Sequence, residues 1–149
     1  MNAFDQPPRF ETDATQLLTA SQVGRFPEYL GIEWLEARTG FITGQLVIRP
    51  HHLSPGNGYL HAASLVGLLD SACGFGCMMS FPTGASSFTT IELKTNFLST
   101  LREGSVVCEA RLSHGGRTTQ VWDAEARAKD TAKVLALFRC TQLLLYPQN

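Results

Sequence analysis

The protein has 149 residues, a length that fits one domain with a sizeable hydrophobic core. Lys and Arg number 12 and Asp and Glu number 13, so the formal net charge is -1. This balance gives no reason to expect nucleic acid or an anionic membrane surface as the main partner. The N-terminus has acidic residues and prolines but no apolar segment, so we do not expect a secretory signal there.

An arm and a short helix are expected over residues 1–27, and a single domain over residues 28–149. Within the first part, residues 1–13 contain two prolines and are expected to form the arm, and residues 14–25 are expected to form the helix. Pro27 is expected to end this helix, because the residue before a proline avoids the helical region.

Alternation of apolar and polar residues predicts six strands, over residues 29–38, 41–49, 87–98, 105–113, 117–129 and 132–146. In the third of these strands, Leu93 and Phe97 are expected on one face with Ile91, and Thr90 on the other. Short turns between long strands imply an antiparallel sheet. A single long helix then lies against one face of the sheet, which gives an α+β domain.

The four cysteines form no C-x-x-C pair, and no other ligand lies at a metal-binding spacing from them. They are Cys73, Cys77, Cys108 and Cys140. Buried free thiols are typical of a reducing compartment. We therefore expect a cytoplasmic protein without a metal site.

The stretch over residues 55–81 reads as one long helix with a Gly-rich entrance, and Asp70 is its only formally charged residue after Leu60. A carboxylate in such a helix is costly to bury unless something pairs with it or uses it. The stretch is nearly long enough to span a bilayer, but Asp70 and the glycines argue against a membrane span. Gly67 and Gly74 share a helix face with Asp70, so a sheet, a second helix or a ligand is expected to approach closely there.

The helix entrance contains Gly-Asn-Gly, in which Asn57 is expected to act as a capping residue. The first backbone N–H groups of a helix have no partner within the helix and lie at the positive end of its dipole. Near residues 61–63, such groups are suited to hold a developing oxyanion.

Asp70 and this N-terminus cannot serve one reaction from the same chain, because nine residues of helix span roughly 13 Å. An attacking carboxylate and an oxyanion hole must both lie within about 3 Å of the same carbonyl group. A neighbouring antiparallel helix would bring its own N-terminus toward Asp70. We therefore expect a homodimer in which Asp70 of one chain faces residues 61–63 of the other.

This pattern resembles the hotdog-fold acyl-CoA thioesterases, particularly their phenylacetate-degradation-type branch. In that family a Gly-containing loop leads into a helix that begins His-Gly-Gly, with the catalytic Asp or Glu nine residues after the His. Here His61-Ala62-Ala63 and Asp70 stand at that spacing, and residues 89–98 and Gly116-Arg117 match a later strand and a later turn. The resemblance implies a hotdog fold, in which an antiparallel sheet wraps around one long central helix.

The resemblance also implies roles for individual residues. Asp70 would act as nucleophile or general base, the Ala62 N–H would polarise the thioester carbonyl, and His61 would shape the loop or contact the substrate. Further substrate contacts are expected from Asn57, Gly58, Ala63, Gly74, Thr90 and Arg117, the last toward the phosphates of coenzyme A. No cofactor is implied, because coenzyme A is part of the substrate.

This chain departs from the family pattern at three places. His61-Ala62-Ala63 stands where the family has His-Gly-Gly, a change that a backbone donor role tolerates. Pro55 stands where some relatives carry Asn or Gln, six residues before the His, and Gly74 stands where a neighbouring branch carries Ser or Thr. Asn57 is the nearest substitute for the missing upstream amide.

Two alternative functions stay open from the sequence. A hydratase or dehydratase on the same fold needs a His and a carboxylate at one substrate carbon, and His52 with Asp70 are its candidates. A non-catalytic acyl-CoA binder is the second alternative, whereas the absence of G-x-S-x-G argues against a serine hydrolase. The sequence also leaves the acyl group open, and the candidate residues for its pocket are Phe75, Met78, Met79 and Phe81. It does not distinguish coenzyme A from acyl carrier protein as the carrier, or a dimer from a dimer of dimers.

Overall fold

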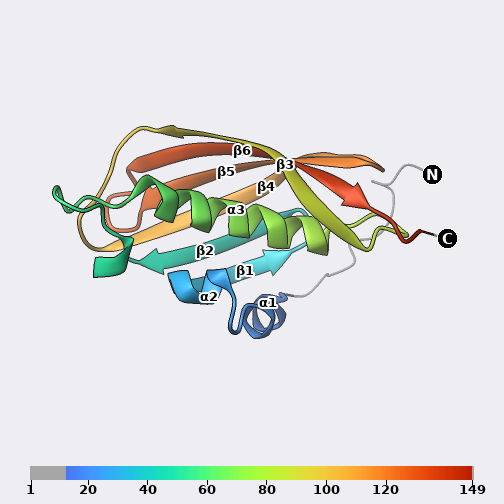
Figure 1. The fold of residues 1–149 in the computed structure, drawn as a ribbon, viewed down its shortest axis with the longest axis horizontal. Coiled ribbons are helices and arrows are strands. Elements are labelled where there is room, and N and C mark those ends of the chain that lie inside the picture. The colour runs from blue at the N-terminus through green and yellow to red at the C-terminus, as the bar shows by residue number, and fades with distance from the viewer. Residues whose placement is uncertain (1–12, 149) are drawn as a thin grey trace.

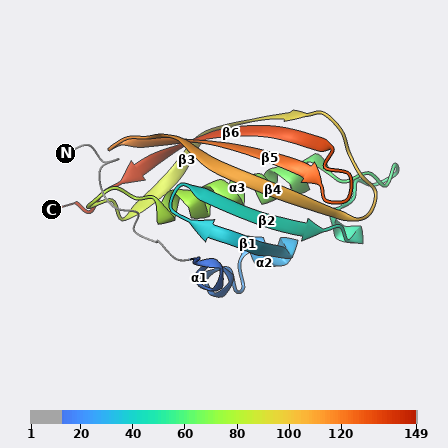
Figure 2. The same ribbon diagram turned by 180° about the vertical axis from the view of Figure 1, so that it is seen from behind.

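The computed structural model describes residues 13–148, so the predicted arm lies outside it except for Asp13. The strands are β1 (Ile32–Arg38), β2 (Phe41–Val47), β3 (Ser87–Phe97), β4 (Ser105–Gly115), β5 (Thr119–Ala128) and β6 (Val134–Leu145). They form one antiparallel sheet in the order β1-β2-β4-β5-β6-β3. The long helix α3 (Ala62–Met79) lies along one face of this sheet (Figure 1), and the view from behind shows the strands covering it (Figure 2). The predicted α+β architecture is confirmed.

Helix α3 passes a length and composition test for a membrane span, but it packs as the core helix of this domain. Leu68 and Leu69 are fully buried against the sheet, as is Trp122 of β5. A Cβ at Gly76 would lie 2.5 Å from the Trp122 ring, so glycine is what lets the helix approach the sheet there.

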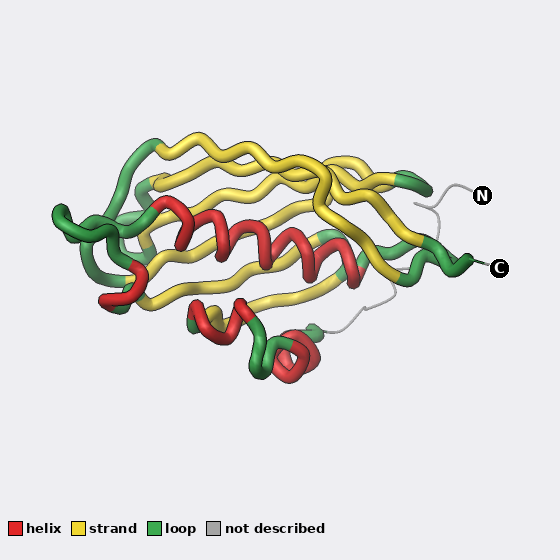
Figure 3. Tube along the Cα trace, viewed as in Figure 1, coloured by secondary structure: helices red, strands yellow, loops and turns green. Residues whose placement is uncertain are grey.

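The N-terminal helices differ from the prediction. Helix α1 (Thr15–Ser21) is shorter than expected, and a second helix, α2 (Phe26–Leu30), forms where the sequence predicted a helix end and the start of a strand. Pro27 lies in the first turn of α2, where a missing N–H costs no intrahelical hydrogen bond. Gly31 ends α2 at a φ of 74°, in the left-handed region. Figure 3 shows both helices grouped near β1.

The close approach expected at the glycines of α3 comes from this chain's own elements. A Cβ at Gly67 would lie 2.6 Å from the Leu30 side chain of α2. A Cβ at Gly74 would lie 3.2 Å from the Phe88 ring of β3. Since these glycines flank Asp70, α2 and β3 form the two sides of the surface around that carboxylate.

Strand β3 contains a bulge at Ile91, where the pairing with β6 slips by one residue. Thr90 lies opposite Gln142, while Leu93 and Phe97 lie opposite Cys140 and Ala136. Those three partners alternate along β6 and share its buried face. Thr90 therefore lies on the same face as Leu93 and Phe97, and the predicted assignment to opposite faces is wrong because the bulge shifts the alternation.

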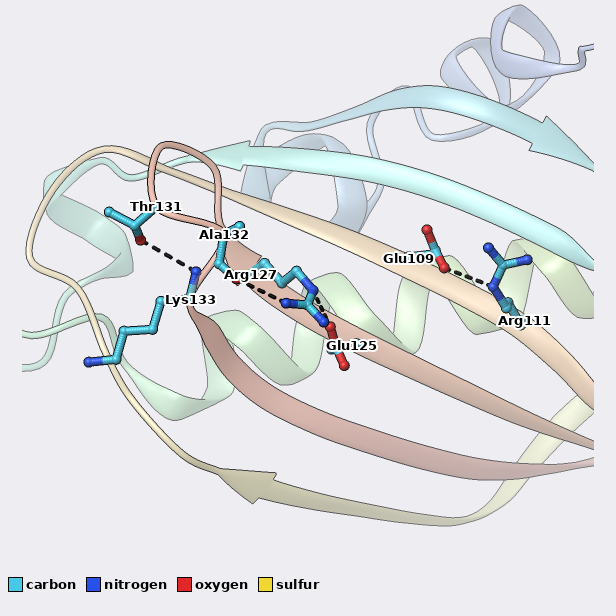
Figure 4. Close-up of polar contacts among 7 residues, drawn as sticks. All are labelled: Glu109, Arg111, Glu125, Arg127, Thr131, Ala132 and Lys133. Atoms are coloured by element: carbon cyan, nitrogen blue, oxygen red, sulfur yellow. Dashed lines mark hydrogen bonds and ion pairs between the residues drawn. The ribbon is translucent and has the colours of Figure 1, made fainter.

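The outer face of the sheet, away from α3, carries exposed charged side chains. Arg111 pairs with Glu109 at 2.7 Å, and Arg127 pairs with Glu125 (Figure 4). Exposed pairs of this kind contribute about 0–1 kcal/mol each. A shallow depression lies on this face between the pairs, on the opposite side of the sheet from Asp70, so it is not part of the site described below.

All four cysteines are buried and unlinked, as predicted. Burial raises the pKa of the Cys77 and Cys108 thiols to about 12. Thiols of this kind carry no thiolate at neutral pH, so they act as small core residues.

Candidate active site

Asp70 lies in the middle of α3 on its less buried side, and its Oδ1 atom is buried without a hydrogen-bond partner among the described residues. Burial raises the pKa of the Asp70 carboxyl above its usual value. No salt bridge found within residues 13–148 involves this carboxylate. A buried polar atom without a partner needs an explanation, and a perturbed carboxyl group near a surface is a candidate catalytic group.

The N-terminus of α3 is capped by His61, not by Asn57 as predicted. The Nδ1 atom of His61 accepts a hydrogen bond of 3.0 Å from the Ala63 N–H. The Asn57 side chain instead accepts from the Tyr59 N–H at 3.0 Å, which stabilises the turn before the helix. Because Nδ1 accepts, neutral His61 carries its proton on Nε2 and presents a donor to the outside.

One backbone amide at this N-terminus is available to a ligand. The Ala63 N–H is used by His61, and the Ser64 N–H donates to the His61 carbonyl at 2.9 Å. In the described part of the chain the Ala62 N–H has no hydrogen-bond partner, and Ala62 is exposed. Among the predicted oxyanion donors, the structure therefore favours Ala62 over Ala63.

Asp70 and Ala62 are separated by eight residues of regular helix, or about 12 Å of rise. One chain therefore does not bring the carboxylate and the amide to the same carbonyl group. Both groups lie on α3, where the helix fixes their spacing.

The remaining predicted contact residues lie in the loop before α3, on α3 itself and on β3. Gly58 has a φ of 68° and forms part of the loop before the helix. Gly74 is covered by the Phe88 ring, and the Thr90 hydroxyl donates to Gln142 at 2.8 Å on the buried face of the sheet. These contacts place β3 beside the C-terminal half of the helix.

Arg117 lies in the turn between β4 and β5, where its carbonyl accepts a hydrogen bond from the Tyr146 hydroxyl. Three residues further on, Gln120 donates to the carbonyl of Ser80 at 2.8 Å, just after α3 ends. Arg117 is therefore at the opposite end of α3 from the helix N-terminus of its own chain.

Three of the four candidate pocket residues are committed to intramolecular packing. Met79 is 2% exposed in the core, Phe75 packs edge-on against Trp34, and Phe81 packs against Phe88. Met78 is 45% exposed and lies free on the surface of the described chain.

His52 is the residue whose importance the sequence did not reveal. It was a candidate base for a hydratase, but its side chain is 1% exposed and both ring nitrogens are hydrogen-bonded to backbone groups. It is therefore not placed to act on a substrate. Its partners, Leu30 and Arg49, come from separate segments, so no local pattern signals this role.

Comparisons with known proteins agree with this geometry. The family model of the thioesterase superfamily matches residues 57–135, which include the whole of α3. The 1,4-dihydroxy-2-naphthoyl-CoA hydrolase of Listeria monocytogenes is 32% identical over 114 residues, covering 76% of this chain and 90% of that protein.

Solved structures share the fold. A mutant of thioesterase PA1618 from Pseudomonas aeruginosa superposes with a TM-score of 0.85 at 28% identity, covering 93% of this chain and 98% of that one. The PaaI protein from the phenylacetic acid degradation operon of Escherichia coli gives a TM-score of 0.76 at 21% identity, with coverage of 88% and 93%. The predicted hotdog fold is thus confirmed, and with the family match it follows that the chain belongs to the thioesterase superfamily and is a thioesterase.

Proposed function

We propose that the protein hydrolyses an acyl-CoA thioester to a free acid and coenzyme A at a site built from two chains. The observation that carries this proposal is the half-buried carboxylate of Asp70, whose Oδ1 atom has no hydrogen-bond partner within residues 13–148, on the same helix as the Ala62 N–H, which has none there either. The similarity to a 1,4-dihydroxy-2-naphthoyl-CoA hydrolase supports a thioester of coenzyme A as the substrate.

The two edges of the sheet support a dimer that forms through β3. The edge at β1 is covered by the chain itself, because Asp13 accepts from the Ala37 N–H at 2.9 Å and Gln22 donates to the Ile32 carbonyl at 2.9 Å. Strand β3 is the other edge of the described sheet. An uncovered edge strand is a template for pairing with another chain.

The side chains of β3 support the same interface. Large apolar groups are exposed along and just after this strand, at Ile91, Leu93, Phe97 and Leu98. A second copy paired antiparallel along β3 would cover them and would bring the two α3 helices side by side in opposite directions. Ala62 of one chain would then lie near Asp70 of its partner.

In this arrangement Asp70 either attacks the thioester carbonyl or accepts a proton from the attacking water. The carbonyl oxygen becomes negatively charged in both routes, and the partner's Ala62 N–H stabilises it. The carbon–sulfur bond then breaks, and coenzyme A leaves as its thiolate. In the general-base route the thiolate takes the proton held by Asp70, and the free acid forms directly. In the nucleophilic route the acyl group remains on Asp70 as an anhydride, which water hydrolyses to the free acid while the thiolate takes up the proton that the water releases. The raised pKa of Asp70 suits a proton acceptor that works near neutral pH.

The other predicted residues surround this reaction centre. On the chain that supplies the Ala62 N–H, the outward Nε2 donor of His61, the loop at Asn57 and Gly58, and Ala63 in the first turn of α3 would contact the thioester end of the substrate. Arg117 lies beyond Asp70 toward the end of α3, where its guanidinium would meet the phosphates of coenzyme A. Thr90 and Gly74 would support the β3 side of the site. Coenzyme A enters only as part of the substrate, and we place the protein in the cytoplasm.

The experiment that tests this function measures thiol release from a panel of short, long and aromatic acyl-CoAs. We expect hydrolysis of at least one thioester, and the panel then identifies the acyl class. Loss of a conjugated double bond without thiol release would favour the hydratase alternative, and saturable binding without turnover would favour the non-catalytic binder. A parallel panel of acyl carrier protein thioesters separates the two carriers.

A further inference from the structure

His52 connects the end of α2, the residue before its own short helix and the beginning of α3. It ends the short 3-10 helix η2 (Pro50–His52) and is 1% exposed. Its Nδ1 atom accepts from the Arg49 N–H at 2.9 Å, and its Nε2 atom lies 2.9 Å from the carbonyl oxygen of Leu30, the last residue of α2. Because an amide donor binds Nδ1, the proton of the neutral ring is on Nε2 and is donated to Leu30.

The backbone carbonyl of His52 binds the beginning of α3. It accepts from the N–H of His61 at 2.9 Å and from the hydroxyl of Ser64 at 3.0 Å. His61 directly precedes Ala62, and Ser64 lies in the first turn of the helix. The imidazole of His52 therefore holds this residue against Arg49 and Leu30, and its backbone carbonyl holds the N-terminus of α3.

We propose that His52 is a positioning residue that fixes the backbone amide of Ala62 in the orientation needed to hold the oxyanion. This inference rests on the proposed function, in which the Ala62 N–H is the oxyanion donor. A catalytic donor must be held within about 0.5 Å of its productive position, and a misplacement of about 1 Å can cost on the order of a hundredfold in rate.

The chemistry of the imidazole explains why this position holds a histidine. A buried aliphatic side chain would fill the space without the cost of burying a polar ring. Only a side chain with one acceptor and one donor on opposite edges binds the Arg49 N–H and the Leu30 carbonyl at the same time. The ring is kept neutral by burial, by the neighbouring His51 ring at 4.1 Å and by the charge of Arg49, which together lower the pKa of His52.

The test compares His52→Leu, His52→Asn and His52→Gln with wild type on the best thioester from the panel. The leucine variant lacks both hydrogen bonds, the asparagine keeps an acceptor near the Nδ1 position, and the glutamine keeps a donor near the Nε2 position. We expect kcat of His52→Leu to fall about ten- to hundredfold with little change in KM, and both amide variants to recover part of the loss. His51→Leu is the matched comparison, because it removes the ring contact with His52 at 4.1 Å but none of the hydrogen bonds of His52; its kcat should fall much less than that of His52→Leu.

A second variant keeps the inference testable if His52→Leu does not fold. Ser64→Ala removes the hydroxyl that binds the His52 carbonyl and leaves His52 intact, and we expect a smaller fall in kcat, again with KM unchanged. Unchanged kcat per folded protein in both variants, with only a lower melting temperature, would overturn the inference. Ala62→Pro separates this failure from that of the proposed function: if it loses activity while the His52 and Ser64 variants do not, only the role of His52 is wrong.

Discussion

Replacing Asp70 with asparagine should lower kcat at least about a hundredfold, the scale of a lost general base or nucleophile. Asparagine has nearly the same size but carries no negative charge, so it neither attacks the thioester nor accepts a proton from water. The measurement is thiol release by the folded variant, with its oligomeric state compared with wild type. Asp123→Asn is the matched control, because Asp123 is paired with Arg139 on the outer face of the sheet, and it should keep the wild-type rate.

The same substitution should also raise thermal stability at neutral pH. The pKa of Asp70 is raised in the folded protein above the value of 3.8 for an exposed carboxyl. The folded state therefore binds the proton more tightly than the unfolded state, and the free energy of unfolding falls as pH rises from about that value through the folded pKa. The asparagine side chain does not ionise, so the variant avoids this loss. A lower melting temperature for Asp70→Asn than for wild type at pH 7 would contradict a buried, unpaired carboxylate.

The ionised form of Asp70 is also the active form, so kcat/KM should rise with pH through the raised pKa and not near 3.8. Activity and stability therefore depend on pH in opposite directions at this residue. Such a conflict is typical of groups that are kept for function at the expense of stability.

Replacing Ala62 with proline should lower kcat about a hundred- to a thousandfold, the effect of removing one oxyanion donor. Ala62 is the first residue of α3, a position where proline is favoured because the missing N–H has no intrahelical partner. The preceding His61 has φ -65° and ψ 135°, within the region that a residue before proline adopts. The substitution therefore deletes one N–H group and leaves the helix intact.

Ala62→Ser is the control for this variant, because it changes the side chain at the same position but keeps the backbone N–H. It should lose far less activity than the proline variant, and both should melt close to wild type. A proline variant that keeps its kcat would show that the oxyanion is held elsewhere. If the proline variant has a much lower melting temperature than wild type, kcat is compared per amount of folded protein.

The sequence was sufficient to predict the order of the strands and the central helix along the chain. Apolar and polar residues alternate clearly along β4, β5 and β6, and turn residues separate these strands. It also singled out Asp70, since a single charge in an apolar helix is a local signal, and the catalytic role of this residue stays a prediction. It did not predict α2, because Pro27 is compatible both with the end of one helix and with the first turn of another.

Two other features depend on contacts between distant segments. The bulge at Ile91 moves Thr90 to the face of β3 that carries Leu93 and Phe97, and nothing in the alternation of that strand indicates it. His52 binds Leu30, which lies 22 residues away, and its buried position follows only from the folded chain. Capping by His61 was missed because Asn57 is the more common capping type.

The central claim is that one site uses Asp70 from one chain and Ala62 from its partner. The most direct measurement mixes Asp70→Asn and Ala62→Pro chains, unfolded and refolded together, and compares thiol release with each variant alone. A heterodimer would contain one site with both residues intact and one with both altered, so random mixing, in which about half the dimers are mixed, should restore about a quarter of the wild-type activity. If the mixture is no more active than the two variants measured separately, each site takes both residues from one chain and the account is wrong.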